Sequence, residues 1–230
     1  DALARELSSR QYAALILEPI QGEAGVVTLS DEYLRAAREL TRETGTLLVL
    51  DEVQSGCGRT GAFLASQQSG ILADLVCLAK PLAAGLPIGT TLAARDVGES
   101  LGPGDHGSTF GGGPLVCRAA LVLLSELFDH GLLEHVEKIG AAFQEGLIGL
   151  ERRHDCVAAQ RGRGLMQALA LRTDAGPVAD GLAGRGLLAS ATAGKVLRFL
   201  PPFVIGRAQI DEALSILDAE LGLHDSARYS

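Results

Sequence analysis

The chain has 230 residues, 47% of them hydrophobic, which is enough to bury a substantial core in one large domain or two small ones. Its formal net charge is −8 and no Lys- or Arg-rich run occurs, which argues against nucleic acid or an anionic membrane as a partner. No stretch approaches the roughly 18 uncharged apolar residues of a spanning helix, and the four cysteines form no C-x-x-C pair, which argues against a zinc site. Widely spaced cysteines in apolar or loop settings indicate free thiols in a reducing cytoplasm.

The first 130 residues have the pattern of alternating strands and helices. Ser30 is a plausible N-cap, and Asp31 and Glu32 place negative charge in the first turn of the helix that follows. We expect a helix end over 1–10, strands over 13–17, 47–50 and 75–78, a helix over 31–44, and a strand of reversed direction over 90–94. Such alternation predicts an α/β fold with a mainly parallel sheet.

Beyond residue 130 the pattern changes to that of a small α+β domain. Pro114 suits the first turn of the helix that precedes this boundary. The expected elements are helices over 114–129 and 132–152, a strand over 165–171, a short helix, strands over 187–189 and 196–199, and a helix over 208–221. The polar segment 224–230 is expected to fray. The predicted domains are therefore residues 1–130 and residues 131–230.

Two of the buried-strand patterns each end in a single charge, Asp51 and Lys80. Ligands bind beyond the carboxyl ends of the strands in open α/β sheets. An acid at this place is often only a cap or turn residue, and a lysine is more often a solvated strand end. Lys80, however, continues into an apolar loop, and Pro81 keeps it out of the α region, so a helix cannot run through it. Desolvation on such a loop can favour nucleophilic use of the amine, and an amine with an acid is what pyridoxal phosphate (PLP) requires.

Five segments, in order, carry a specific resemblance over nearly the whole chain. They are residues 17–25, 50–61, 78–89, 106–112 and 196–202. With these segments the chain resembles the class III aminotransferases, and among them the acetylornithine subgroup with its ornithine and acyl-lysine relatives. The resemblance implies a fold-type I PLP-dependent transferase, in which residues 1–130 are the C-terminal part of the PLP-binding large domain and 131–230 form the small C-terminal domain.

The resemblance implies four roles around the ring of PLP. Lys80 would form the internal aldimine and later move the proton between substrate and cofactor. Asp51 would pair with the ring nitrogen and keep it protonated, and Gln54 would donate to the phenolic oxygen. Val53 would pack against one face of the ring, where a β-branched side chain is stiff and apolar.

The same resemblance implies ligands for the phosphate and for the substrate. Ser108 and Thr109 would donate to the phosphate, in this family usually that of the neighbouring subunit, so a homodimer with shared active sites is expected. Arg198 would clamp the substrate carboxylate with two hydrogen bonds. Glu23 would lie on the substrate side and help to select the amino donor, although by itself it has the pattern of a loop acid beside glycines.

The implied reaction moves the side-chain amino group of N2-acetylornithine, or of a related ornithine or acyl-lysine donor, to 2-oxoglutarate, on the route to arginine or lysine. The chain begins at Asp1 and shows neither a Gly/Ser/Thr phosphate loop nor an aromatic placed to stack on the ring, so we expect the C-terminal portion of such an enzyme. The alternative is a remnant that folds or dimerises without binding PLP productively.

Two other motifs compete with this interpretation. Residues 56–61 match G-x-G-x-x-G, but residues 51–55 intervene after the strand, and no acid ends a second strand about 20 residues further on, as a dinucleotide site requires. A P-loop nucleotidase would explain the apolar strand that ends in Asp-Glu, but the chain has no G-x-x-x-x-G-K-[ST] loop. That interpretation would also leave Lys80 and Arg198 without a role.

Overall fold

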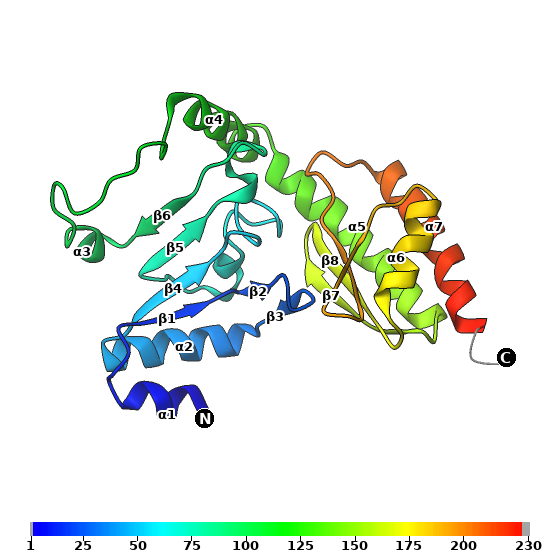
Figure 1. The fold of residues 1–230 in the computed structure, drawn as a ribbon, viewed down its shortest axis with the longest axis horizontal. Helices are drawn as coiled ribbons and strands as arrows, with labels where there is room; N and C mark the ends of the chain where they lie inside the picture. Colours follow the sequence, from blue (N-terminus) through cyan, green and yellow to red (C-terminus); the bar gives the residue numbers. More distant parts are fainter. Residues whose placement is uncertain (1, 227–230) are drawn as a thin grey trace. The chain divides into compact units, whose positions relative to one another are not determined.

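The computed structural model describes residues 2–226 and divides the chain into two compact units (Figure 1). The first unit comprises Asp1–Pro19, Leu29–Gly58 and Ala62–Gly131. The second unit comprises Ile20–Thr28, Arg59–Gly61 and Leu132–Ser230. No helix within residues 2–226 is both long and apolar enough to cross a bilayer.

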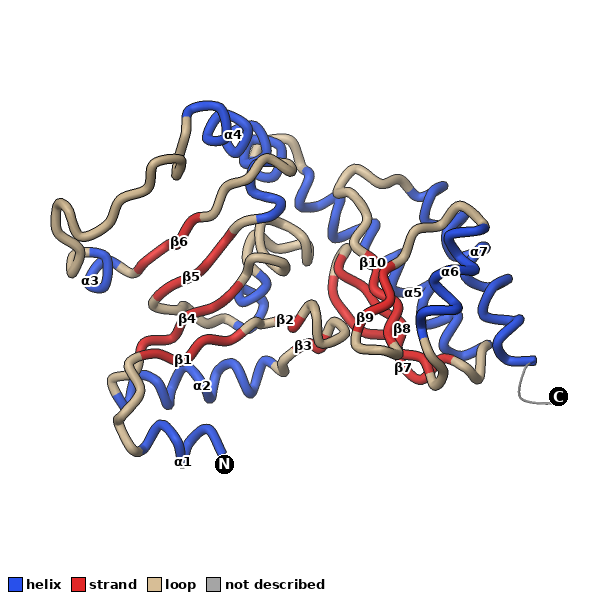
Figure 2. The backbone as a smooth tube through the Cα atoms, viewed as in Figure 1, coloured by secondary structure: helices blue, strands red, loops and turns tan. Residues whose placement is uncertain are grey.

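The first unit is built on a four-stranded sheet. Its strands are β1 (Ala14–Leu17), β4 (Leu47–Asp51), β5 (Leu75–Leu78) and β6 (Thr90–Ala93), in that spatial order (Figure 2). β1, β4 and β5 are parallel, and β6 is antiparallel to β5. The predicted α/β class, the mainly parallel sheet and the reversed fourth strand are therefore confirmed, with strand ends that differ from the predictions by at most one residue.

Helices cover one face of this sheet. α2 (Asp31–Thr44) begins where it was predicted to begin, because the Ser30 side chain accepts a hydrogen bond from Tyr33 N at 3.1 Å. The other helices of this unit are α1 (Ala2–Ser8), η1 (Ala65–Ser69), η2 (Lys80–Ala83), α3 (Arg95–Gly98) and α4 (Pro114–Phe128). The buried face of the sheet contributes Leu48, Leu50, Val76 and Leu78 to a core that also contains Leu34 and Ala120. On edge strand β1, Ile16 is 66% exposed, so the burial of this sheet is one-sided.

The second unit has an antiparallel sheet covered by long helices. Its sheet has the order β7 (Val157–Arg163), β8 (Met166–Leu171), β10 (Val196–Phe199) and β9 (Ser190–Thr192), and its helices are α5 (Leu132–Arg153), α6 (Ala175–Gly184) and α7 (Arg207–Ser226). A short hairpin, β2 (Ile20–Gln21) with β3 (Val27–Thr28), belongs to the same unit. α5, β8 and β10 agree with the predictions to within one residue, and α6 is the predicted short helix. α7 begins one residue before its predicted start but continues to Ser226. The last four residues of the segment predicted to fray lie outside the described residues.

Two predictions for the second unit were wrong. β7 was missed, because its sequence VAAQRGR has neither an apolar run nor clean alternation, and its pairing with β8 supplies the order instead. A strand was expected over 187–189, but β9 begins at Ser190, where it pairs with Arg198 of β10. Residues 187–189, which precede β9, line a pocket instead of pairing with a neighbouring strand, and Leu188 is 86% exposed.

Candidate functional site

Two consecutive acids at the end of β4 have opposite surroundings. Asp51 is the last residue of the strand, and its Oδ1 accepts a hydrogen bond from Val53 N at 3.0 Å. The Glu52 side chain is fully buried and accepts hydrogen bonds from Ala65 N at 2.6 Å, Ser66 N at 2.9 Å and Ser55 Oγ at 3.3 Å. Glu52 therefore fixes the turn, and Asp51 is left with a carboxylate oxygen that has no partner within residues 2–226.

Packing also explains the glycine that closes this turn. A Cβ on Gly56 would lie 2.5 Å from Leu78 Cδ2 and 2.7 Å from Glu52 O, which is closer than real Cβ atoms approach. The turn after β4 consequently packs directly on the end of β5. The strand ends that carry Asp51 and Lys80 are thus held in a fixed register, in which Asp51 is paired with Cys77.

Lys80 follows β5 in an unusual backbone conformation. Its φ is +23°, a region that L-residues rarely adopt, and such strain concentrates at functional sites. The 3-10 helix η2 begins at Lys80 rather than running through it, as the following proline predicted. The side chain is exposed, so the expected desolvation of the amine by its apolar loop is not observed. No acidic side chain forms an ion pair with Lys80 in the described part of the chain.

Two hollows lie beyond the strand ends of the first unit. Val53 and Ser108 line the larger, which has a volume of about 770 Å³, and Lys80 lines the other, of about 570 Å³. The residues common to both linings are Ala79, Gly89, Gly111 and Gly112. The structure therefore brings Val53, Lys80 and the 106–112 segment to adjoining cavities, whereas Asp51, Gln54 and Thr109 are not among their lining residues.

The 106–112 segment is an exposed turn. Ser108 Oγ accepts a hydrogen bond from Gly111 N at 2.9 Å, and a Cβ on Gly111 would lie only 2.7 Å from the same oxygen. The glycine is therefore required for this turn to hold the hydroxyl in place. Thr109 is exposed beside it, and Gln54 is partly buried in the turn after β4.

The second unit brings together the two residues predicted to bind substrate. Arg198 Nη1 donates hydrogen bonds to Glu23 Oε1 at 2.8 Å and to Gly22 O at 3.1 Å. The Arg198 side chain is 13% exposed and that of Glu23 is 71% exposed. Thr192 Oγ1 donates to Glu23 O at 2.9 Å and so fixes the β2–β3 hairpin that carries the acid. Arg198 is already paired with a carboxylate, which the sequence did not predict.

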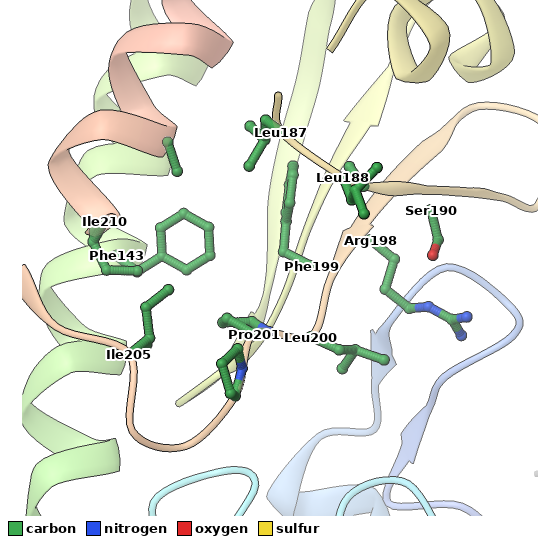
Figure 3. A pocket seen from close by; sticks show the side chains of 13 residues that line it. Phe143, Leu187, Leu188, Ser190, Arg198, Phe199, Leu200, Pro201, Ile205 and Ile210 are labelled. Carbon is green, nitrogen blue, oxygen red and sulfur yellow. The ribbon is translucent and has the colours of Figure 1, made fainter. Parts of the chain in front are cut away.

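Arg198 also borders an apolar pocket of about 350 Å³ (Figure 3). Phe143, Phe199 and Ile210 lie on one side of this pocket, and the Arg198 side chain extends away from them. The guanidinium is thus presented to the β2–β3 hairpin and not to the apolar wall.

Sequence reasoning missed two residues that shape these sites, Glu52 and Arg59. Glu52 was read only as part of a motif, although two acids that directly follow a buried strand are unlike ordinary solvated turn residues. Arg59 lies in the glycine-rich segment 56–61 and donates hydrogen bonds to two backbone carbonyls of the second unit. A cation bracketed by glycines is a signal of close backbone packing that could have drawn attention to it.

Comparison with known proteins gives consistent matches over the chain. The model of the family Aminotransferase class-III matches residues 1–221. The chain is 44% identical over 212 residues to the acetylornithine aminotransferase of Aquifex aeolicus, covering 92% of this chain and 54% of that protein. It is 46% identical over 222 residues to that of Mycobacterium bovis, covering 96% of this chain and 55% of that protein. The chain therefore spans about half the length of the curated relatives that it matches.

Solved structures show the same likeness. A structure of the Toxoplasma gondii ornithine aminotransferase, described as having partial occupancy of PLP at its active site, matches with a TM-score of 0.93 and 36% identity, over 100% of this chain and 55% of that one. The acetylornithine aminotransferase of Elizabethkingia anophelis matches with a TM-score of 0.89 and 34% identity, over 96% of this chain and 57% of that one.

Proposed function

Because the chain belongs to the class III aminotransferase family, we propose that it carries the PLP site of an enzyme that transfers the side-chain amino group of N2-acetylornithine to 2-oxoglutarate. A related ornithine or acyl-lysine donor is the alternative within the same proposal. The observation that supports it most is the placement of Asp51 and Lys80 at the carboxyl ends of adjacent parallel strands, with Lys80 lining one of two adjoining hollows. In α/β sheets this edge is where ligands bind.

The residues of the first unit fit PLP. Asp51 offers an uncommitted carboxylate oxygen for a protonated ring nitrogen, and Lys80 offers an amine for the aldehyde. Val53 lines the larger hollow and offers an apolar wall for the ring. The Ser108 hydroxyl and the accessible backbone groups of the glycines around it suit a phosphate, which in the proposed dimer is that of the neighbouring site. The volume of about 770 Å³ lies within the usual range of cofactor pockets.

The roles of the side chains follow from their chemistry. Bound PLP would supply an electron sink for the carbon that loses its proton. Asp51 would keep the ring nitrogen protonated, and Gln54 would donate to the phenolic oxygen. Lys80 Nζ would take the proton from the donor carbon that bears the transferred amino group, because an amine at this place can act as a general base. The strained backbone of Lys80 would help to aim its side chain.

Arg198 would bind a carboxylate of the substrate, and Glu23 would compete with that carboxylate for Arg198. The guanidinium of Arg198 would clamp a carboxylate of the donor or of 2-oxoglutarate, which its planar fork suits. In the structure Glu23 occupies this guanidinium, so an incoming carboxylate has to displace or share it. Glu23 is 71% exposed, and an exposed ion pair costs little to break. We propose that Glu23 thereby helps to discriminate between donors.

A homodimer is the proposed assembly. α4 is apolar on nearly all sides, yet Leu115 is 74% exposed, Leu121 57% and Val122 49%, and Phe110 on the preceding turn is 91% exposed. A helix of this composition is normally covered. A second copy of the chain would cover it and bring Ser108 and Thr109 to the phosphate of the neighbouring site. In sedimentation velocity, Leu121→Glu should dissociate the dimer, whereas Leu188→Glu, at an 86% exposed position of the other unit, should not.

The two units would correspond to two domains. We propose that the first unit is part of the PLP-binding large domain and that the second contains the small C-terminal domain. Cys57, Cys77, Cys117 and Cys156 form no disulfide with one another within residues 2–226, which supports a reducing compartment such as the cytoplasm.

The proposal is tested by incubating the purified chain with PLP, N2-acetylornithine and 2-oxoglutarate and measuring glutamate. Formation of glutamate that is lost in Lys80→Ala and retained in Lys138→Ala would support it, because Lys138 is an exposed lysine of α5. Ornithine and an acyl-lysine, used in place of N2-acetylornithine, identify the preferred donor by rate. A folded chain that neither binds PLP nor forms glutamate would contradict the proposal and favour a remnant that folds or dimerises without the cofactor.

A further inference from the structure

Arg59 makes a set of contacts in the second unit that the roles above do not use. Its Nη1 donates hydrogen bonds to Pro201 O at 2.5 Å and to Leu165 O at 3.3 Å. Its guanidinium also lies over the ring of Phe203, 4.3 Å from the centroid. One side chain thus holds the β7–β8 turn and both ends of the segment 201–203.

The main chain around Arg59 is equally fixed. Leu165 N donates a hydrogen bond to Arg59 O at 3.0 Å, so backbone and side chain of Arg59 bind the same turn. A Cβ on Gly164 would lie 2.5 Å from the backbone carbon of Thr60, and one on Gly140 would lie 2.5 Å from Gly164. The backbones at Thr60, Gly164 and Gly140 are therefore in direct contact. This close packing holds the main chain of Arg59 in place, so its side chain is directed to Pro201.

Arg59 has no acidic partner in the described part of the chain. Loss of water around its guanidinium lowers its pKa to about 10, so the group remains charged at neutral pH. A partly buried cation that is satisfied only by carbonyls and an aromatic face is costly to place. Arginine suits these contacts better than lysine, because its planar fork can reach two carbonyls while its face stacks on a ring.

The segment that Arg59 holds is the direct continuation of the strand that carries Arg198. Arg198 is the third residue of β10, which ends at Phe199, and Pro201 follows two residues later (Figure 3). β10 is held by β8 on one side and by β9 on the other, but the paired register ends at Phe199. Beyond that residue, the hydrogen bond from Arg59 to Pro201 O fixes the chain.

We propose that Arg59 is a positioning residue for Arg198: by binding Pro201 and Phe203 it fixes the end of β10 and so aims the Arg198 guanidinium at the carboxylate that it binds. The inference rests on the proposed function for the identity of that carboxylate. The orientation of Arg198 itself is already visible without ligand, in its bonds to Glu23 and Gly22.

The test observes Arg198 directly, by the Nε–Hε resonances of the ¹⁵N-labelled full chain. The Arg198 resonance is assigned by its absence from Arg198→Lys, and Glu23→Gln gives its position when the ion pair is lost. In Arg59→Lys we expect the Arg198 resonance to move toward its position in Glu23→Gln. We also expect the Kd for 2-oxoglutarate to rise about tenfold, because a misdirected Arg198 loses one charge-assisted hydrogen bond to the carboxylate. The matched control is Arg185→Lys, which alters a pair with Glu220 at 2.7 Å elsewhere in the unit.

The outcomes are separable. An Arg198 resonance in Arg59→Lys that matches wild type would overturn the proposal, as would an equal displacement in Arg185→Lys. If the wild-type chain binds no 2-oxoglutarate, the proposed function fails, but the resonance still decides whether Arg59 positions Arg198. If Arg59→Lys does not fold, Phe203→Leu serves instead, because it removes only the ring and leaves both hydrogen bonds of Arg59 in place. A smaller displacement of the Arg198 resonance in the same direction is then expected. An undisplaced resonance in Phe203→Leu would overturn the proposal.

Discussion

The candidate sites of the two units differ in how their charged groups are held. In the first unit, Asp51 accepts one hydrogen bond and Lys80 is exposed with no ion pair in the described part of the chain. In the second unit, Arg198 is 13% exposed and already bonded to the carboxylate of Glu23. The charged groups of the first candidate site make few contacts, whereas Arg198 in the second is bonded to a carboxylate of the chain itself.

The two candidate sites thus order their charged groups in different ways. In the first unit, the surroundings of Asp51 and Lys80 are ordered rather than their charged groups. Glu52, next to Asp51, accepts hydrogen bonds from three donors, and the backbone of Lys80 is held in a strained conformation. The second unit orders the functional group itself, through Glu23. We therefore expect substitutions near the first site to separate stability from binding, and substitution of Glu23 near the second to change mainly binding.

The largest expected effect is on the free energy of unfolding, and it distinguishes Glu52 from Asp51 at the end of β4. Glu52→Ala leaves two buried backbone N–H groups and a hydroxyl without acceptors, which should lower the free energy of unfolding by about 3 kcal/mol. Asp51→Asn should lower it by less than about 1 kcal/mol, because one hydrogen bond from Val53 N can be retained. Urea denaturation measures both. Equal losses for the two variants would refute the division of labour between these acids.

A smaller effect is expected when the Glu23 carboxylate, which pairs with Arg198 in the second unit, is removed. Glu23→Gln eliminates the charge that competes for Arg198, so 2-oxoglutarate should bind about two- to fivefold more tightly at low salt. Calorimetric titration measures the change, and the gain should shrink as salt screens the pair. The control Asp211→Asn breaks an exposed pair with Arg207 at 2.8 Å and should leave the affinity unchanged. Unchanged or weaker binding in Glu23→Gln would show that Glu23 does not compete for the guanidinium.

An effect of similar size concerns acid stability in the first unit. Partial burial opposes ionisation of Asp74, but hydrogen bonds from Arg38 and from Leu48 N, with the charge of Arg38, outweigh it and lower the pKa of Asp74. A carboxylate with a lowered folded-state pKa stabilises the fold above its unfolded pKa of about 3.9, and this contribution is lost as the pH falls through the folded value.

Asp74→Asn should therefore be less stable than wild type at pH 7, by about 1 kcal/mol, and the difference should shrink below about pH 4. Denaturation at a series of pH values measures it. A difference that stays constant from pH 7 to pH 3 would show that Asp74 does not contribute through its charge.

The second unit has the corresponding acids on α7. Hydrogen bonds from His154 and Arg153 lower the pKa of Asp218, and a hydrogen bond from Cys156 N helps to lower that of Asp225 against partial burial. Both units are thus expected to lose stability on the acid side. The comparison of Asp74→Asn with Asp218→Asn assigns the loss to one unit or the other.

Much of the first unit could be predicted because local and long-range signals agree there. Ser30, an acidic first turn and Gly45 specify α2, and apolar runs specify β4 and β5. β7 could not be predicted, because its polar, glycine-containing sequence becomes a strand only through pairing with β8. The ion pair of Glu23 with Arg198 joins residues 175 positions apart, so no local pattern could reveal it.

Motifs predicted the candidate site residues, but they did not predict the surroundings of these residues. The apolar loop after Lys80 suggested a desolvated amine, whereas the loop folds into η2 and leaves the side chain exposed. Glu52 has the same side-chain chemistry as Asp51 and follows it directly, and only the packing of residues 65–66 decides which of them is buried. Burial of this kind depends on contacts distant in sequence.

The most direct test of the account is to find which amine of the chain binds PLP. The chain has three lysines, Lys80, Lys138 and Lys195, so borohydride reduction after incubation with PLP, followed by peptide mass mapping, gives an unambiguous assignment. With a PLP site at the strand ends of the first unit, the pyridoxyl group should be found on Lys80 at a stoichiometry near one. Asp51→Asn should lower this labelling, and Lys138→Ala should not. Labelling spread equally over the three lysines, or unaffected by Asp51→Asn, would contradict a PLP site at the strand ends of the first unit.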